Sequence, residues 1–418
     1  MYALVDGNNF YASCERVFNP ALQHKPIVVL SNNDGIIIAR SNEAKALGIK
    51  MGIPAFKIKN LINTHQVIAF SSNYALYGDM SQRMMQIFQN FSPDIEIYSI
   101  DEAFLDFSGF KQNDLKQIGL KLRKTVLKQI GIPVSVGFGP TKTLAKIANR
   151  IAKKHMKNGV ALIDNPYKIE RALKMTPLDD VWGIGRQYSK FLKKHKLETA
   201  WDFTRLSDTY IRKQMSINGL RTKAELLGTA CIPMSAVPQN RKAIRTARTF
   251  VKSTANYDFV AEAVAGFAAR CGEKLRQQQS VANLLTVFIR TDKFARSKKY
   301  YANSFTLQIN ATSSSIELIK AAKIALKIIY KKTYAYKKAG VLVSGLVQEK
   351  HRQLSLFDDS NYIRQRQAMK IIDQINQTNG YHLLKFAAEG PSRAWHLQQE
   401  HRSKRYTTRW EELIEIKL

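Results

Sequence analysis

The chain has 418 residues and a formal net charge of +32, because 65 Lys and Arg outnumber 33 Asp and Glu. A chain of this length is expected to form several domains. So large a positive surplus repels itself in isolation, which predicts a polyanionic partner such as nucleic acid. No apolar run is long enough to span a bilayer and no basic leader precedes the first predicted strand. We therefore expect no membrane partner and no exported protein.

The three cysteines, Cys14, Cys231 and Cys271, are widely separated, and the histidines are dispersed as well. This spacing fits neither a disulfide framework nor a structural zinc site. We therefore expect a reduced protein of the cytoplasm.

Residues 1–165 mix predicted strands and helices. A buried strand over 2–6 ends at Asp6, where a loop begins, and a helix over 9–18 follows. Functional side chains commonly lie at such strand-to-loop points. The sequence Ser31-Asn32-Asn33-Asp34-Gly35 between two apolar runs predicts a hairpin, and Ser41 begins a further helix.

Asp101 and Glu102 lie between two runs of alternating apolar residues, which predict two strands joined by a tight turn. Adjacent carboxylates repel each other unless a cation lies between them, and such oxygen ligands suit Mg²⁺. Asp6 supplies a third carboxylate from the N-terminus. The alternative is a solvated hairpin turn that binds nothing.

Helices are also predicted from residue 74, over 111–129 and after Gly139-Pro140-Thr141, with a strand over 134–138 between the last two. This order favours an α+β sheet with helices on one face. In the last helix the apolar residues share the inward side. The other side carries Lys142, Lys146, Asn149 and Lys153.

After about residue 166 the strand signals disappear. Gly183-Ile184-Gly185 joins two predicted helices, an arrangement that exposes backbone N–H groups to phosphate. Its basic surroundings support phosphate binding over a plain turn. The segment 231–241, with two prolines, reads as a linker.

Residues 243–347 give the order strand, helix, strand, strand, helix, strand, which is the split β-α-β arrangement of an independent domain. Basic residues on its strands and on the loop of its middle hairpin suit a track for phosphates. A lysine stripe on its second helix is interpreted as a solvated outer face. The proposed track comprises Arg245, Arg248, Lys252, Arg290, Lys293, Arg296, Lys298 and Lys299.

The last part of the chain contains an apolar pentapeptide in polar surroundings, Gln353-Leu354-Ser355-Leu356-Phe357. It is either a docking peptide or a linker with stray hydrophobic residues. An amphipathic helix around 369–375 follows it. Trp395, Tyr406 and Trp410 then lie among charges, a pattern typical of protein–protein contacts.

Several of these segments together resemble the Y-family translesion DNA polymerases, in particular the UmuC type that forms the catalytic subunit of bacterial DNA polymerase V. The resemblance runs through nearly the whole chain. It is carried by residues 6–15, 31–35, 98–104, 182–185, 353–357 and 405–410.

The resemblance implies an α+β, right-hand polymerase with palm, small fingers, helical thumb and a split β-α-β little-finger domain. The implied boundaries are palm 1–19 and 74–165, fingers 20–73, and thumb with a helix-hairpin-helix 166–232. A linker over 233–241 leads to the little finger, 242–348, and a clamp-binding peptide and partner-binding tail complete the chain, 349–418.

By resemblance, the catalytic carboxylates are Asp6, Asp101 and Glu102, which with the carbonyl of Gly7 would bind two Mg²⁺ ions. Tyr11 would be the steric gate against a ribose 2′-hydroxyl; the alternative for it, as for Phe10, is a core aromatic. Family members carry Tyr-x-x-Arg where this chain has Asn42 and Lys45, so a weaker triphosphate grip is expected. The implied nucleotide-binding residues are Phe10, Tyr11, Ile38, Ala39, Asn42, Lys45 and Lys146. Lys142 is a less certain phosphate contact, and both lysines could instead be solvated.

The implied partners are primer-template DNA, deoxynucleoside triphosphates, a bacterial sliding clamp, a UmuD-type subunit and a recombinase filament. DNA contacts are expected from Gly183, Gly185 and the basic residues of 242–348 given above. Clamp contacts are expected from Gln353, Leu354, Leu356 and Phe357.

We interpret the chain as an error-prone, template-directed DNA polymerase of SOS-type repair and mutagenesis that lacks proofreading and acts at the nucleoid. Two alternatives come from other classes. A non-catalytic DNA-binding scaffold would bind DNA without extending a primer. A nucleotidyl cyclase also pairs carboxylates across strands, but it has no use for a basic second domain.

Overall fold

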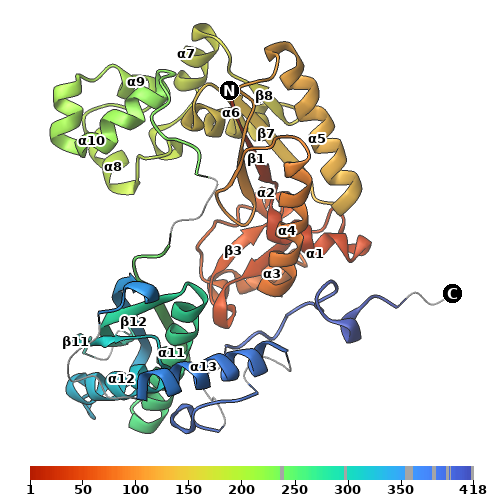
Figure 1. The fold of residues 1–418 in the computed structure, drawn as a ribbon. Coiled ribbons are helices and arrows are strands. Elements are labelled where there is room, and N and C mark those ends of the chain that lie inside the picture. The colour runs from red at the N-terminus through yellow and green to blue at the C-terminus, as the bar shows by residue number, and fades with distance from the viewer. Residues whose placement is uncertain are drawn as a thin grey trace. The chain divides into compact units, whose positions relative to one another are not determined.

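The computed structural model describes residues 1–235, 240–295, 299–353, 361–378, 383–391, 395 and 397–415. The chain forms two compact units (Figure 1). Unit 1 comprises Met1–Pro238 and Gln399–Leu418, and unit 2 comprises Gln239–Gln398. The sequence predicted one tail over 349–418, whereas the structure divides this region between the two units.

A five-stranded sheet in unit 1 has the order β5-β6-β1-β7-β8. Its central strand, β1, is buried along nearly its whole length and pairs antiparallel with β6 and β7. The register places Asp6 opposite Glu102. The strands are β1 (Tyr2–Gly7), β5 (Ile95–Ile97), β6 (Glu102–Asp106), β7 (Val134–Gly139) and β8 (Val160–Leu162).

Helices cover both faces of this sheet. On one face α4 (Tyr74–Gln89) and α5 (Leu115–Ile130) enclose the main core of unit 1. On the other face α6 (Lys142–His155) packs Ala145 against Leu4 and Phe104. The prediction of helices on one face only was therefore wrong for this sheet. The physical reason is Gly137, whose missing side chain lets the backbone of α6 lie directly on β7.

A smaller sheet of unit 1 has the order β3-β2-β4. The predicted hairpin is present as an antiparallel pair of β2 and β3, and β4, which the sequence did not reveal, pairs parallel with β2. Ser41 caps α2, as expected, by accepting a hydrogen bond from the Ala44 N–H. The elements of this region are α1 (Phe10–Val17), β2 (Ile27–Leu30), β3 (Ile37–Arg40), α2 (Asn42–Ala46), α3 (Lys59–Thr64) and β4 (Ile68–Ser71).

A helical region completes the N-terminal part of unit 1. No strand forms over residues 166–235, all of which are described, as the sequence predicted. Its core joins apolar residues of α6 with those of the helices that follow, such as Leu173 and Phe203. These helices are α7 (Pro166–Lys174), α8 (Arg186–Lys194), α9 (Ala200–Thr204) and α10 (Asp208–Leu226).

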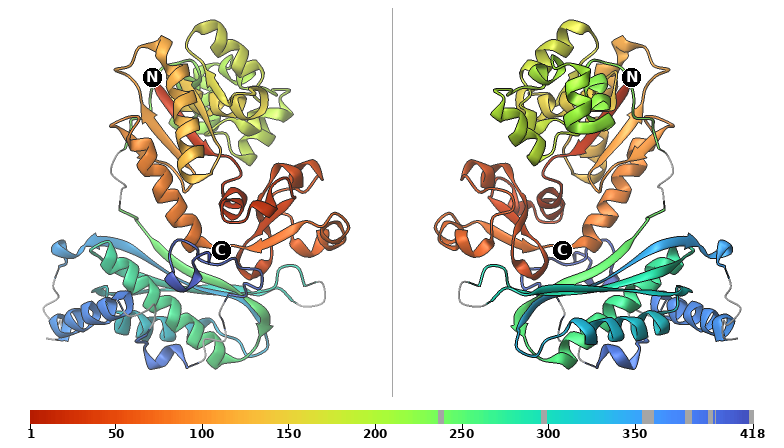
Figure 2. Two further views of the ribbon diagram at one scale, coloured as in Figure 1. Left: turned by 90° about the vertical axis from the view of Figure 1, so that its right-hand side faces the viewer. Right: turned by 90° about the vertical axis from the view of Figure 1, so that its left-hand side faces the viewer.

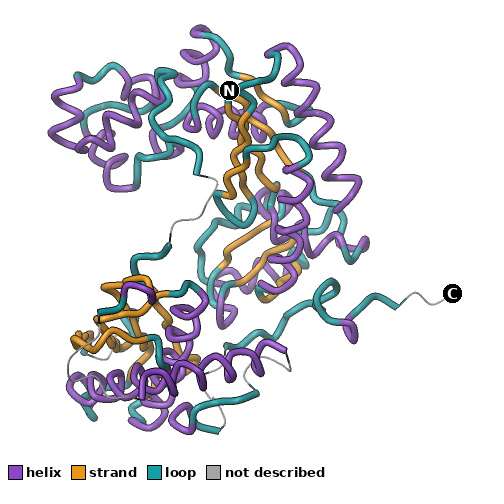
Figure 3. Tube along the Cα trace, viewed as in Figure 1, coloured by secondary structure: helices purple, strands orange, loops and turns teal. Residues whose placement is uncertain are grey.

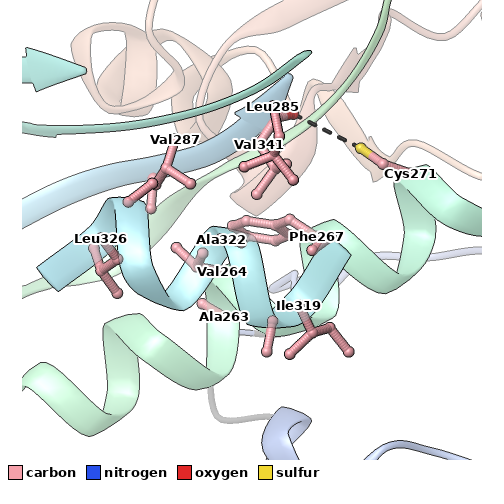
Figure 4. Packing of buried hydrophobic residues seen from close by; sticks show 14 of the residues in the cluster. Ala263, Val264, Phe267, Cys271, Leu285, Val287, Ile319, Ala322, Leu326 and Val341 are labelled. Atoms are coloured by element: carbon pink, nitrogen blue, oxygen red, sulfur yellow. Dashed lines mark hydrogen bonds between the residues drawn. The ribbon is translucent and has the colours of Figure 1, made fainter. Parts of the chain in front are cut away.

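Unit 2 has the predicted split β-α-β order, and its sheet has the order β11-β10-β12-β9. Helices α11 (Tyr257–Gln277) and α12 (Ser315–Ile329) pack on one face of this sheet (Figure 2). Phe267, Leu285 and Leu326 meet in the core, where the Cys271 thiol donates to the Val341 carbonyl (Figure 4). The elements are β9 (Ile244–Thr254), α11 (Tyr257–Gln277), β10 (Ser280–Thr291), β11 (Ala302–Thr312), α12 (Ser315–Ile329), β12 (Tyr336–Gln348) and α13 (Asn361–Thr378).

Loops and turns connect the helices and strands (Figure 3). Short 3₁₀ turns also lie between many of these elements. They are η1 (Pro20–Leu22), η2 (Asn32–Asp34), η3 (Ala55–Ile58), η4 (Gln112–Asp114), η5 (Leu178–Asp180), η6 (Glu349–His351), η7 (Ala387–Glu389) and η8 (Trp410–Glu412). Within the described ranges, no helix combines the length and the apolar character needed to cross a bilayer.

Candidate active site

Three acidic residues lie at the same end of neighbouring strands in unit 1. Asp6 is near the end of β1 and faces Glu102, the first residue of β6. The Gly7 N–H donates to the Asp101 carbonyl at 2.8 Å, which ties the turn before β6 to the end of β1. Asp101 therefore lies in the predicted turn, whereas Glu102 already belongs to the strand.

Each of the three carboxylates has its own partner. Asp6 Oδ1 lies 2.5 Å from the Lys153 ammonium, and Glu102 Oε2 lies 2.8 Å from that of Lys146. Asp101 Oδ1 accepts a hydrogen bond from Ser99 Oγ at 2.6 Å. Among the described residues, no three His, Cys, Asp or Glu side chains are placed to hold one metal ion. Lysine ammonium groups thus neutralise two of the three carboxylates in this structure.

The electrostatics of the site nevertheless favour a cation. Asp6 is 7 % exposed, and burial raises the pKa of its carboxyl to about 7. The Lys153 ammonium lowers this pKa and the charges of Glu102 and Asp101 raise it, so the value of about 7 is the balance of burial and these charges. A buried carboxyl beside two other acids is stabilised in its ionised form by a divalent cation, and the donors are all oxygens. The residues present thus fit a hard ion such as Mg²⁺.

A cavity of about 480 Å³ opens beside Asp6, Gly7 and Asp101. A cavity of this size is typical of a small-molecule site. Most of the predicted nucleotide-binding residues line this cavity, although Asn42 and Lys146 do not. The predicted catalytic residue Glu102 is not part of the lining either. The predicted residues that the structure brings together here are Phe10, Tyr11, Ile38, Ala39 and Lys45.

Two asparagines hold Lys45 at the cavity wall. The Lys45 ammonium donates to Asn9 Oδ1 at 2.5 Å, and Asn9 Nδ2 donates to Asn42 Oδ1 at 3.0 Å. Burial lowers the pKa of Lys45, and the nearby charges of Arg40 and Lys153 lower it further. Asn42 therefore takes part in the site through Asn9 rather than by facing the cavity.

Tyr11 lies in an aromatic stack beside the cavity. Its ring stacks on Tyr77 of α4 with 4.4 Å between centroids and 16° between planes, and the edge of Tyr74 is 6.2 Å away. Burial raises the pKa of Tyr11 to about 12, so the phenol stays neutral at physiological pH. Phe10, by contrast, is only 3 % exposed and packs into the core while touching the cavity.

On helix α6, one predicted phosphate contact was wrong and one residue of the cavity was not predicted. Lys142 is 1 % exposed, lies 2.5 Å from Glu96 and donates to the Pro233 carbonyl, so it is not placed to bind phosphate. Lys153, which the sequence placed on the polar side of this helix but not among the site residues, lines the cavity. It follows Lys146 by seven residues, two turns on the same helical face, and this spacing was the available signal. Arg40 and Asn9 were also missed, although they flank predicted site residues.

The predicted phosphate-binding turn lies between η5 and α8. Gly183 and Gly185 are both exposed, and Gly185 precedes the first turn of α8. Gly183 has φ of +99°, and a Cβ there would lie 2.5 Å from Thr222 Oγ1. Only glycine suits this position, because a side chain would be strained at this φ and would meet Thr222.

The open face of the unit 2 sheet carries clustered cations. Leu285, Val287 and Ile289 of β10 face the helices, so Phe288 and Arg290 lie on the other face. The Arg245 guanidinium lies 5.6 Å from the Phe288 ring centre. Burial lowers the pKa of Lys338 on β12, and the charges of Arg290 and Arg245 lower it further, as expected for neighbours. The sequence did not single out Lys338.

Not all of the predicted DNA contacts lie on this open face. Arg248 is on the helix-covered face, where its guanidinium lies 5.6 Å from the Trp395 ring centre. Lys293 and Lys299 belong to the connection between β10 and β11. Arg296 and Lys298 lie outside the described residues, as do Leu354, Leu356 and Phe357 of the predicted clamp peptide, of which Gln353 is described.

Comparison with known proteins identifies relatives along the whole chain. The profile of the impB/mucB/samB family matches residues 5–150, the C-terminal domain of that family matches 241–356, and a domain of unknown function matches 366–416. The chain is 41% identical to Protein UmuC of Salmonella typhimurium over 423 aligned positions, covering 100% of both chains. Protein SamB of Salmonella typhimurium is 39% identical, again with 100% of both chains covered.

A more distant relative and two solved structures also match most of the chain. DNA polymerase IV of Pelotomaculum thermopropionicum is 26% identical over 385 positions, covering 91% of this chain and 92% of that protein. Among solved structures, the Y-family DNA polymerase chimera Dbh-Dpo4(243-245)-Dbh superposes with a TM-score of 0.67 at 22% identity. It covers 83% of this chain and 99% of the chimera. An insertion ternary complex of Dbh DNA polymerase, also 22% identical, gives a TM-score of 0.55 over 83% of this chain and 99% of that chain.

Proposed function

Because the chain belongs to the impB/mucB/samB (UmuC) family of Y-family translesion DNA polymerases, and is thus a DNA-directed DNA polymerase, we propose that it extends primers past damaged bases by two-metal nucleotidyl transfer. The observation that carries this proposal is the position of Asp6, Asp101 and Glu102 at one end of neighbouring strands, beside a cavity lined by Tyr11 and Lys45. SOS-type repair and mutagenesis is the proposed biological setting, at the nucleoid in the cytoplasm.

Enzymes of this family depend on a divalent metal, and we assign its binding to the three carboxylates and the Gly7 carbonyl. Two Mg²⁺ ions, when bound, supply Lewis-acid charge to the attacking primer hydroxyl and to the triphosphate. Opening the ion pairs of Asp6 and Glu102 releases the Lys153 and Lys146 ammonium groups. Both lysines are then available to the triphosphate, as Lys146 was predicted to be.

The remaining cavity residues position the nucleotide. Lys45, held by Asn9, faces the triphosphate as a point charge, and Arg40 adds a guanidinium, which can bind phosphate in a bidentate way. Ile38 and Ala39 cover the nascent base pair. The Tyr11 ring lies under the sugar, where a 2′-hydroxyl would meet it. Catalysis then rests on orientation and electrostatics, with no covalent intermediate on the protein.

DNA is proposed to bind through its backbone. Arg245, Arg290 and Lys338 form a basic cluster on the open face of the unit 2 sheet, and the amides at Gly183 and Gly185 add uncharged phosphate contacts. Residues 353–357 are proposed to bind the sliding clamp. The tail is proposed to meet a UmuD-type subunit and a recombinase filament. The division into palm, fingers, thumb and little finger given above remains part of this proposal.

Primer extension with the Asp101→Ala/Glu102→Ala variant tests the catalytic assignment. We expect extension in Mg²⁺ to fall by about a thousandfold or more, because several kcal/mol of transition-state stabilisation are lost. DNA binding, measured by fluorescence anisotropy, should stay at the wild-type level. Asp106→Asn is the matched control, since Asp106 lies at the far end of the same strand.

Two outcomes would contradict the proposal. Undiminished extension by the double variant would remove the three acids from the mechanism. A wild-type chain that binds primer-template DNA but never extends it in Mg²⁺ would instead favour the non-catalytic scaffold, in which the lysine pairs neutralise the acids permanently.

A further inference from the structure

The segment 399–412, which we name the returning segment, is built into unit 1 by hydrogen bonds to the end of β4 and to the residue that follows it. The His401 N–H donates to Ser71 Oγ at 2.9 Å, and the His401 carbonyl accepts from the Ser71 N–H at 3.0 Å. Gln399 Nε2 donates to the Ser72 carbonyl at 2.9 Å. Ser71 and Ser72 are at most 1 % exposed, so the returning segment covers the end of β4, while His401 itself stays exposed.

Asn73 connects the returning segment to the start of α4. Its side-chain oxygen caps the helix by accepting from the Leu76 N–H. Its Nδ2 donates to the carbonyl and the hydroxyl of Ser403, at 3.1 and 3.0 Å. Because the same amide serves both elements, the first turn of α4 and Ser403 are held in a fixed relation.

Ser403 also reaches the aromatic stack at the cavity. Its hydroxyl donates to Glu15 Oε1 at 3.0 Å, and the Tyr77 hydroxyl donates to the same oxygen at 2.6 Å. Glu15 is 2 % exposed and Tyr77 is fully buried. Both hydrogen bonds lower the pKa of Glu15, which burial raises above its ordinary value.

A second contact anchors the returning segment to the C-terminal end of α1. The Tyr406 ring stacks on Phe18, which follows the last residue of α1, with centroids 4.8 Å apart and planes 11° apart. Tyr406 packs against the main core of unit 1. The returning segment thus contacts both helices that carry the stacked tyrosines, Tyr11 on α1 and Tyr77 on α4.

We propose that Ser403 is a positioning residue for sugar selection, acting on Tyr11 through Glu15 and Tyr77. The inference rests on the proposed role of Tyr11 as the barrier to a ribose 2′-hydroxyl. A Tyr77 hydroxyl fixed on Glu15 fixes the rotation of the Tyr77 ring, and the Tyr11 ring lies parallel to it. Without the Ser403 bond, the buried Glu15 carboxylate loses one of its two side-chain donors and its position is less well defined.

The test is single-nucleotide insertion by the full chain, comparing kcat/KM for a ribonucleotide with that for the matching deoxynucleotide. For Ser403→Ala we expect the ribo/deoxy ratio to rise by about threefold to tenfold, the effect of losing one hydrogen bond. Ser403→Thr keeps the hydroxyl and should stay near the wild-type ratio. The matched control is Arg409→Ala, whose ion pair with Glu412 lies on the exposed part of the returning segment.

Tyr11→Ala separates this inference from the function on which it rests. We expect Tyr11→Ala to raise the ratio more than Ser403→Ala does, and Ser403→Ala to add nothing in the Tyr11→Ala background. If Tyr11→Ala leaves the ratio unchanged, the barrier role fails and the inference fails with it. If Tyr11→Ala raises the ratio but Ser403→Ala matches Arg409→Ala, only the role of Ser403 is overturned. Equal losses of ribo and deoxy insertion in Ser403→Ala would mark a purely structural residue and overturn it as well.

Discussion

The two units of the molecule each contain a mainly antiparallel sheet with long helices. The two sheets differ in where they carry their functional side chains. In unit 1 both faces of the sheet are covered, and the chemistry lies at the strand ends, where Asp6 meets Glu102. In unit 2 the helices leave one face open, and the charges of Arg245, Arg290 and Lys338 gather on it. Strand ends place a few groups accurately, as catalysis requires. An open face spreads many charges, as binding to a polyanion requires.

The largest effect on stability should come from filling the contact between sheet and helix in unit 1. A Cβ on Gly137 would lie 1.9 Å from the Asn149 backbone nitrogen, and a backbone cannot give way as a side chain can. We expect Gly137→Ala to lower the free energy of unfolding by about 3 kcal/mol or more. Urea unfolding of the full chain measures this.

Gly340→Ala in unit 2 is the matched control for that experiment. A Cβ there meets only side-chain atoms, the Phe288 ring and the Ala247 methyl, each at 2.4 Å. The Phe288 ring can turn aside on an open face, whereas the Ala247 methyl moves only with the backbone of β9. We therefore expect a smaller loss than for Gly137→Ala, about 1 to 2 kcal/mol. Equal losses for the two variants would contradict the proposed difference between the sheets.

Removing three cations from the open face of the unit 2 sheet should weaken DNA binding. For Arg245→Ala/Arg290→Ala/Lys338→Ala we expect weaker DNA binding and a smaller dependence of log K on log salt, by about 0.9 for each phosphate that the protein no longer neutralises. Anisotropy titrations at several salt concentrations measure the slope. An unchanged slope would remove this face from the DNA interface.

Arg248→Ala is the control from the opposite face of the same sheet. Its guanidinium lies over Trp395, so we expect a loss of stability of about 0.5 to 1 kcal/mol and an unchanged salt slope. If Arg248→Ala lowers the dependence of log K on log salt as much as the loss of an open-face residue does, Arg248 contacts DNA after all.

The smallest expected effect concerns Glu15 and pH. Burial raises its pKa above the ordinary value of 4.5. The unfolded chain therefore loses this proton at lower pH than the folded chain, and stability falls as pH rises from 4.5 through the raised pKa. Glu15→Gln carries no such charge, so its stability relative to wild type should rise over that interval. Urea midpoints at a series of pH values measure the difference, and a constant difference would contradict the burial argument.

Local patterns were sufficient to predict most of this architecture. The alternation in 243–347 gave all six elements of the unit 2 fold, and Asp6, Asp101 and Glu102 do lie at neighbouring strand ends. The short strands β4 and β8 were missed, since three or four apolar residues carry little periodicity.

The errors arose where tertiary contacts override the amphipathic pattern. Lys142 was assigned to a polar outer side, yet it is buried against Glu96, because α6 packs on two different cores and has no wide solvent face. The docking of residues 399–412 gave no local signal either. Its hydrogen bonds join positions more than 300 residues apart, and a single sequence does not reveal such pairs.

The return of the chain to unit 1 at residue 399 makes unit 2 an insertion with two attachments instead of a pendant domain. A single cut in the first connection would leave two chains held together by the non-covalent docking of residues 399–412 on unit 1. As long as that docking persists, the nicked protein keeps the cations of the unit 2 sheet at a high effective concentration near unit 1. Cuts in both connections are needed to release unit 2. Limited proteolysis therefore tests whether one connection or two hold unit 2 to unit 1.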